Sequence, residues 1–77
     1  MYENVLLDFG KTVRTLRQAK NISQEQLGDL CGLHRTYISD IELGKRNVSF
    51  ENIIRLSVAL GIKVSDLFVE VEKNESI

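Results

Sequence analysis

Two segments of the chain with helical patterns are separated by only three residues, Gly32, Leu33 and His34. So short a link favours a sharp crossing of the two helices over a side-by-side hairpin. Such a crossing brings two backbones together, and Gly28 leaves space for it because it has no side chain, while Gly32 can take the positive φ of the turn. The side chains expected to fill the angle between the helices are Leu27, Cys31, Leu33, Ile38 and Ile41.

The segments before and after this link also have helical periodicity. Apolar residues recur at steps of three and four over about residues 5–20, which predicts a first helix. Ser23, with Gln26 three residues later, forms a capping box that starts the second helix, and Leu30 is expected on the apolar face of that helix. A third helix is predicted over about residues 35–43, before a glycine that can end it.

Two more helices are predicted in the second half of the chain. Ser49 caps a fourth helix that ends at Gly61, and Ser65 caps a short fifth one. The residues from Lys73 onward are expected to fray. One apolar stripe of the fourth helix consists of Phe50, Ile53, Ser57 and Leu60. Since the chain contains no proline, we predict an all-α fold, a compact domain of five helices.

The composition leaves room for one small domain, residues 1–77, and excludes several kinds of function. The single cysteine, Cys31, cannot form an internal disulfide, and together with the single histidine, His34, it cannot build an ordinary four-ligand zinc site. The sequence has no glycine-rich phosphate loop, HExxH motif or DxD cluster, so we expect no enzyme, cofactor or metal. The core of so short a chain is marginal, and a partner subunit is the expected supplement.

The net charge of −1 does not by itself indicate a nucleic-acid partner, and the distribution of charge is more informative, because only a basic segment would matter to a polyanion. Residues 11–20 carry four basic side chains and no acid, whereas residues 66–77 carry four acidic side chains and one basic one. No apolar run is long enough to cross a bilayer, and residues 1–4 lack the features of a secretory signal. We therefore expect a cytoplasmic protein.

The second helix of the crossing pair is the expected DNA-reading element, within a helix-turn-helix over about residues 24–43. At 100° per residue, Ile38 and Ile41 point toward the core. The outward face then consists of Thr36, Ser39, Asp40 and Leu43. Arg35 stands at the N-terminal end, where its guanidinium could bind guanine O6 and N7, or a phosphate instead. The hydroxyl side chains of the face can reach bases, phosphates or only solvent.

Polar residues beside this helix are candidates for contact with the DNA backbone. Gln24 opens the preceding helix, where its amide can reach a phosphate or remain a plain surface group. Lys45, Arg46 and Asn47 form a polar loop that binds phosphates or is merely solvated. Asp40 does not fit this pattern, because an outward carboxylate repels phosphates unless it accepts from cytosine N4 or pairs with an arginine. The sequence leaves its role open.

These motifs resemble the lambda-repressor/Cro-like family of DNA-binding proteins. The likeness covers about residues 6–68. It rests on Gln24, Gly28, Gly32 and the ending Ile38-Ser39-Asp40-Ile41-Glu42. Within that family, residues 35–39 and 45–47 are similar to the controller proteins of restriction–modification systems.

The resemblance implies a transcriptional regulator that binds an operator in double-stranded DNA. It places Tyr37 against the sugar–phosphate backbone, although the residue could also pack beside the core, and it pairs Arg17 with Glu42 structurally. In a controller, low concentration activates the genes for the protein and its nuclease, and high concentration represses them. Glu25 is the candidate contact for RNA polymerase, and no small-molecule ligand is expected. The alternatives are a phage-type repressor, an antitoxin regulator, or a protein-interaction module without DNA binding.

A homodimer is expected because one recognition helix reads only a few base pairs. The second half of the chain, about residues 50–71, carries more apolar residues than one small core needs, although some of them must close the core beneath the first helix. The residues assigned to dimerisation are Ile54, Val58, Val64, Leu67 and Phe68.

Overall fold

Five helices and no strand make up residues 3–75, the part of the chain that this computed structural model describes. The helices are α1 (Val5–Ala19), α2 (Gln24–Cys31), α3 (Arg35–Glu42), α4 (Phe50–Leu60) and α5 (Val64–Lys73). The predicted all-α, five-helix fold is therefore confirmed. Within the described residues, none of the helices combines the length and the apolar character that a membrane span requires.

Short polar side chains start α2 and α4 as predicted. The Ser23 hydroxyl accepts from the backbone N–H of Gln26 at 3.0 Å, and the Gln26 side chain accepts from the Ser23 N–H at 2.8 Å. This reciprocal pair satisfies two backbone donors that a helix start leaves without partners. At α4, the Ser49 hydroxyl accepts from the N–H of Asn52 at 3.2 Å. Both predicted caps are confirmed.

The predicted cap of the fifth helix, Ser65, is wrong. Helix α5 begins at Val64, with Lys63 as its N-cap and without a side-chain cap. The carbonyl of Lys63 accepts from the N–H of Leu67 at 2.8 Å, so the helical ladder already includes Ser65. This start places Leu67 and Val71, both buried, on one face of the helix, and burial of that face decides the boundary.

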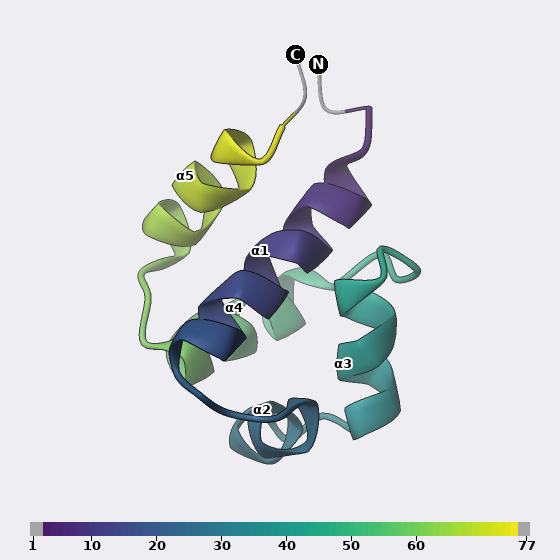
Figure 1. Ribbon diagram of the computed structural model, residues 1–77, viewed down its shortest axis with the longest axis vertical. Helices are drawn as coiled ribbons and strands as arrows, with labels where there is room; N and C mark the ends of the chain where they lie inside the picture. Colours follow the sequence, from purple (N-terminus) through teal and green to yellow (C-terminus); the bar gives the residue numbers. More distant parts are fainter. Residues whose placement is uncertain (1–2, 76–77) are drawn as a thin grey trace.

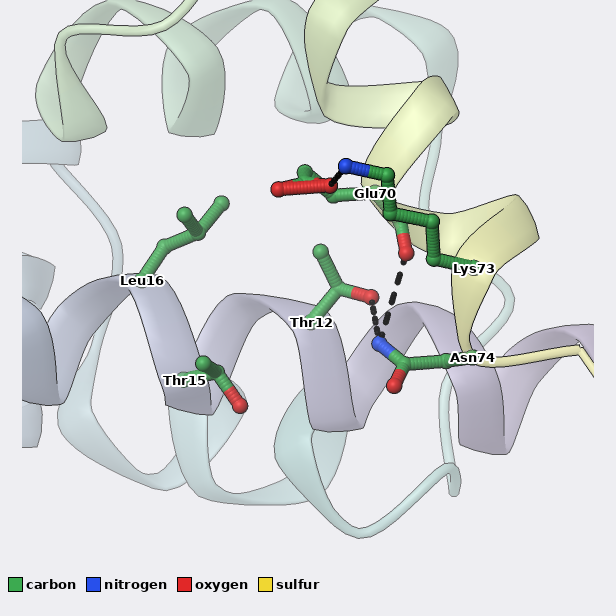
Figure 2. Close-up of a pocket in the computed structure, with 6 residues that line it drawn as sticks. All are labelled: Thr12, Thr15, Leu16, Glu70, Lys73 and Asn74. Atoms are coloured by element: carbon green, nitrogen blue, oxygen red, sulfur yellow. Dashed lines mark hydrogen bonds and ion pairs between the residues drawn. The ribbon is translucent and has the colours of Figure 1, made fainter.

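The end of α5 is joined to α1 by a hydrogen bond (Figure 2). Asn74 Nδ2 donates to Thr12 Oγ1 at 2.7 Å and to the carbonyl of Glu70 at 3.4 Å. Lys73 Nζ lies 3.0 Å from Glu70 Oε2. A hollow of about 200 Å³ is lined by Thr12, Thr15, Leu16, Glu70, Lys73 and Asn74. The expectation that the chain frays from Lys73 is wrong for residues 73–75, and residues 76–77 lie outside the described part.

Helix α1 is the central element, because α3, α4 and α5 all pack against it. Helices α3 and α5 lie on opposite sides of α1, and α2 lies at one end, where it crosses α3 (Figure 1). The buried apolar side chains form one cluster that joins all five helices. They are Phe9, Val13, Leu27, Cys31, Ile38, Ile41, Leu56, Leu60, Leu67 and Val71.

Three apolar side chains are placed differently from the sequence-based expectation. Leu30 is 62% exposed, because it lies about 100° around α2 from Cys31 and outside the buried stripe. Phe50, the first residue of α4, is 75% exposed. Leu67 is 0% exposed within its own chain, so its assignment to a dimer surface is wrong.

Gly10 permits a close contact between α1 and α3 that sequence reasoning missed. A Cβ at this position would collide with the carbonyl oxygen of Ile41 and would lie 2.8 Å from that of Glu42. Both obstacles are backbone atoms, which cannot move aside as a flexible side chain can. The spacing of α1 and α3 therefore depends on a glycine in the middle of a helix.

Gly10→Ala tests this dependence, because the substitution can either raise or lower the free energy of unfolding. In an unconstrained helix interior, replacing glycine by alanine stabilises by roughly 0.5–1 kcal/mol. Here we expect destabilisation by about 2 kcal/mol, since the added methyl group forces the helices apart. Urea unfolding measures the change, with Gln18→Ala, at an exposed position of α1, as the control. A stabilised Gly10→Ala variant would contradict the close contact.

Candidate nucleic-acid interface

The crossing of α2 and α3 is built around the backbone at Gly28. The N–H of Leu33 donates to the Gly28 carbonyl at 2.9 Å, and a Cβ on Gly28 would collide with the Leu33 carbonyl oxygen. Gly32 ends α2 with φ of 71°. The predicted need for glycine at position 28 is thus confirmed, and the tight turn makes α3 leave α2 at a sharp angle.

Helix α3 buries one face and exposes the other. Ile38 and Ile41 are 0% and 1% exposed, so they fix the helix to the core. Opposite them, Thr36 is exposed and Ser39 is half-buried, while Leu43, just past the end of the helix, is 54% exposed. The predicted division of this helix into a core face and an outward face is confirmed.

The N-terminal end of α3 presents an arginine without an internal partner. His34 caps the helix, since its Nδ1 accepts from the N–H of Thr36 at 3.1 Å. Arg35 follows and is exposed, and no hydrogen bond or ion pair occupies its guanidinium within residues 3–75. It borders an open hollow that Glu25 and Asp29 of α2 also line. All five donors of Arg35 are therefore available to a ligand.

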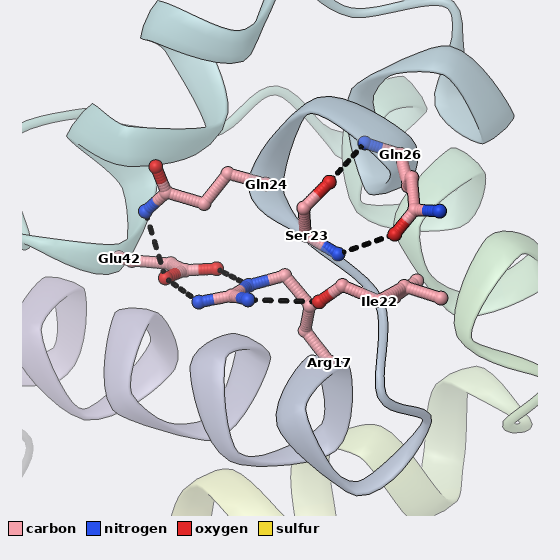
Figure 3. Close-up of polar contacts among 6 residues, drawn as sticks. All are labelled: Arg17, Ile22, Ser23, Gln24, Gln26 and Glu42. Atoms are coloured by element: carbon pink, nitrogen blue, oxygen red, sulfur yellow. Dashed lines mark hydrogen bonds and ion pairs between the residues drawn. The ribbon is translucent and has the colours of Figure 1, made fainter.

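Glu42 joins α1, α2 and α3 through its carboxylate (Figure 3). Arg17 donates from Nε to Oε2 at 2.7 Å and from Nη2 to Oε1 at 3.0 Å, and its Nη1 donates to the carbonyl of Ile22 at 2.9 Å. The hydrogen bond to Glu42 and its charge raise the pKa of Arg17 against the opposing effect of burial. The structure thus brings together the two residues that the resemblance pairs.

Gln24 is also held by Glu42. Its Nε2 donates to Glu42 Oε1 at 3.1 Å, and the side chain is half-buried (Figure 3). The amide therefore has a partner inside the protein, which sequence reasoning did not foresee. One N–H of the amide remains available beyond this bond, and a phosphate contact by Gln24 stays a prediction.

Asp40 has a partner that the sequence left open. Its Oδ2 lies 3.4 Å from Nε of Arg46, and the Arg46 guanidinium carbon lies 5.1 Å from the centroid of the Tyr37 ring. The Tyr37 hydroxyl in turn accepts from Asn52 Nδ2 of α4 at 3.2 Å. Arg46 thereby joins the segment after α3 to that helix, and Tyr37 joins α3 to α4. Tyr37 is half-buried and packs against the core.

The remaining predicted contact residues are exposed. Lys45, Arg46 and Asn47 lie in the irregular segment between α3 and α4, and Glu25 lies on the outer side of α2. Asn52 is the residue that sequence reasoning missed here, because its link to Tyr37 depends on how α4 packs.

The residues assigned to dimerisation differ in exposure. Val58 is 74% exposed, whereas Ile54 and Val64 are half-buried. Phe68 is 38% exposed, and its ring centroid lies 6.2 Å from that of Phe9, so the side chain also serves the chain's own packing. Leu67 belongs to the core, as described above. Among the residues assigned to dimerisation, Val58 is therefore the most exposed apolar side chain.

The described residues contain no group of three or more His, Cys, Asp or Glu side chains that could hold a metal ion. Cys31 is buried, and its Sγ lies 3.9 Å from the carbonyl oxygen of Arg55. Burial raises the pKa of the Cys31 thiol, an effect that the charge of Arg55 partly offsets. The residue fills space in the core and lacks the features of a reactive thiol.

Comparison with known proteins identifies the family of the chain. Residues 13–67 match the helix-turn-helix family. The chain is 56% identical over 68 residues to the control protein C.BamHI of Bacillus amyloliquefaciens. The aligned region covers 87% of this chain and 84% of that relative. It is 44% identical over 71 residues to the control protein C.MunI of a Mycoplasma species, and this alignment covers 91% of this chain and 96% of that relative.

A solved structure gives the same result for the fold. The restriction–modification controller protein C.AhdI of Aeromonas hydrophila superimposes with a TM-score of 0.80 at 49% sequence identity, and the match covers 82% of this chain and 96% of that one.

Glu42→Gln tests whether the ion pair stabilises the site. The side chains of Arg17 and Glu42 are 11% and 3% exposed, so removing one charge leaves the other buried without compensation. We expect a loss of about 3 kcal/mol in the free energy of unfolding, measured with urea. The control is Glu51→Gln, which removes an exposed pair with Arg55 at 3.1 Å and should cost roughly 0.5 kcal/mol or less. Equal losses in both variants would contradict a stabilising role of the buried pair.

Proposed function

The chain belongs to the lambda-repressor/Cro-like helix-turn-helix family, as a DNA-binding transcriptional regulator of the restriction–modification controller type, and we propose that it binds a palindromic operator as a homodimer. The observation that carries the proposal is the division of α3, with Ile38 and Ile41 buried and Arg35 and Thr36 exposed at its N-terminal end. Side chains at this end of a recognition helix meet base edges in the major groove.

Contacts on either side of α3 would supply affinity without sequence preference. Lys45, Arg46 and Asn47 are exposed just past the helix, and Tyr37 lies between them and α4. Basic side chains in this position bind phosphates and displace counterions, whereas Arg35, Thr36 and Ser39 select the bases. The proposed function is binding, and it requires no catalytic group.

Two copies of the chain are needed because one α3 covers only a few base pairs. A homodimer places two recognition helices about 34 Å apart, one turn of DNA, and adds the binding energies of two half-sites. The exposed apolar side chain of Val58, together with Ile54, Val64 and Phe68, supports association through α4 and α5. The monomer core is complete without Val58, so the side chain is available for a partner.

The regulated genes are proposed to be those of a restriction–modification system, including the gene of the regulator itself. The proposed signal is the concentration of the protein itself. At low concentration the first dimer activates transcription, with Glu25 on the exposed side of α2 as the contact for RNA polymerase, and at high concentration further occupancy represses. This function places the protein in the cytoplasm, with the chromosome.

Arg35→Ala tests whether this side chain reads a base. We expect operator binding to weaken by about 1–3 kcal/mol, and the preference at one base pair in each half-site to relax. Gel shifts with the operator and with random-sequence competitor measure both effects. The control is Lys63→Ala, which removes an exposed cation at the N-cap of α5, a helix that lies on the other side of α1 from α3 (Figure 1). An equal loss on operator and random DNA would make Arg35 a phosphate contact only.

Val58→Asp tests the proposed dimer. A charge on this exposed position leaves the core intact but opposes an apolar contact, so we expect monomers with an unchanged circular dichroism spectrum and a disproportionate loss of operator affinity. Sedimentation velocity gives the oligomeric state, and Gln18→Asp on α1 controls for the added charge. A monomer with wild-type operator affinity would contradict the dimer mechanism, and a persistent dimer would place the interface elsewhere.

A further inference from the structure

We propose that Asp40 is a positioning residue that holds the Arg46 guanidinium beside the recognition helix, ready to bind a pair of acceptor atoms on DNA. The inference rests on the proposed function and adds a role for a carboxylate that otherwise opposes DNA binding. It assigns Arg46 a fixed place in the interface, in contrast to a freely moving cation in a solvated loop.

The contacts of Arg46 leave its outer end available. The bond to Asp40 uses Nε, at 3.4 Å, and the Tyr37 ring lies 5.1 Å from the guanidinium carbon. Within residues 3–75, no hydrogen bond occupies Nη1 or Nη2, and the side chain is 51% exposed. These two nitrogens form the edge of a guanidinium that can bind two acceptors at once, such as guanine O6 and N7 or two phosphate oxygens.

Three contacts together restrict a side chain that is otherwise flexible. Asp40 holds one edge of the guanidinium, Tyr37 lies against its face, and Asn52 fixes Tyr37 to α4 through the 3.2 Å hydrogen bond. Each contact alone is weak at an exposed site. Their combined effect is to favour one orientation before DNA arrives, so that less conformational freedom is lost on binding.

Because Asp40 is negatively charged, the proposal can be tested by whether its removal strengthens or weakens binding to DNA. The carboxylate is 28% exposed on the outward side of α3, where it repels phosphates. If repulsion were its only effect, Asp40→Ala would strengthen binding to every DNA. If Asp40 positions Arg46, the same variant weakens binding, because the lost arrangement of Arg46 outweighs the relief from repulsion.

The experiment uses the full chain and a duplex that the wild-type protein selects from a random pool. We expect Asp40→Ala to bind this operator about tenfold more weakly, the size of one lost bidentate contact. Asp40→Asn keeps an oxygen that can accept from Nε and should bind closer to wild type. In an Arg46→Ala background, Asp40→Ala should cause no further loss. A loss confined to the operator indicates that Arg46 reads a base edge, and an equal loss on random duplex indicates a phosphate.

Two results would overturn the inference. Tighter binding by Asp40→Ala would reduce Asp40 to a source of repulsion, and a loss that persists in the Arg46→Ala background would mean that Asp40 itself accepts from a cytosine. Glu51→Ala, which removes an exposed acid paired with Arg55, controls for the loss of a surface ion pair, and circular dichroism controls for folding. If the wild-type chain selects no duplex at all, it is the proposed function that fails.

Discussion

The carboxylate of Glu42 is the interaction on which the arrangement of the first three helices depends. Donors from α1 and α2 converge on this one side chain at the end of α3, with Arg17 Nε at 2.7 Å and Gln24 Nε2 at 3.1 Å. A buried carboxylate is costly unless its lone pairs are satisfied, so alternative helix packings that separate these donors are disfavoured. The orientation of α3, and therefore the site, follows from this requirement.

Close contacts between the backbones of neighbouring elements hold the helices together in addition to the few side chains of the small core. Gly10 lets α1 meet the end of α3, and Gly28 lets α2 meet the turn before α3, each with a carbonyl oxygen where a Cβ would lie. Recognition helix α3 is thus approached closely from two sides, which limits its movement without a large hydrophobic interior. The same closeness makes the domain sensitive to a single methyl group at either position.

Local signals predicted most of the helices but not how side chains meet across them. The caps Ser23 and Ser49 act through atoms three residues away, so sequence spacing suffices to predict them. The prediction of Ser65 as a cap was wrong because burial of Leu67 and Val71 sets the start of α5, and burial depends on the whole fold.

The candidate site shows the same division between local and tertiary information. The outward face of α3 follows from helical periodicity. The pairing of Asp40 with Arg46, and of Gln24 with Glu42, depends on loop and helix positions that a sequence pattern does not encode. The pairing of Arg17 with Glu42 was accessible only through the resemblance to a known family.

The bond between Asn74 and Thr12 has a consequence for the order of folding. It joins residues 62 positions apart. Closing so long a loop costs more chain entropy than closing the three-residue turn between α2 and α3. We therefore expect the local pairing of α2 with α3 to form early and the distant docking of α5 on α1 to form later. During synthesis or refolding, we therefore expect the elements proposed to face DNA to assemble before the chain completes the surface proposed for its own second copy.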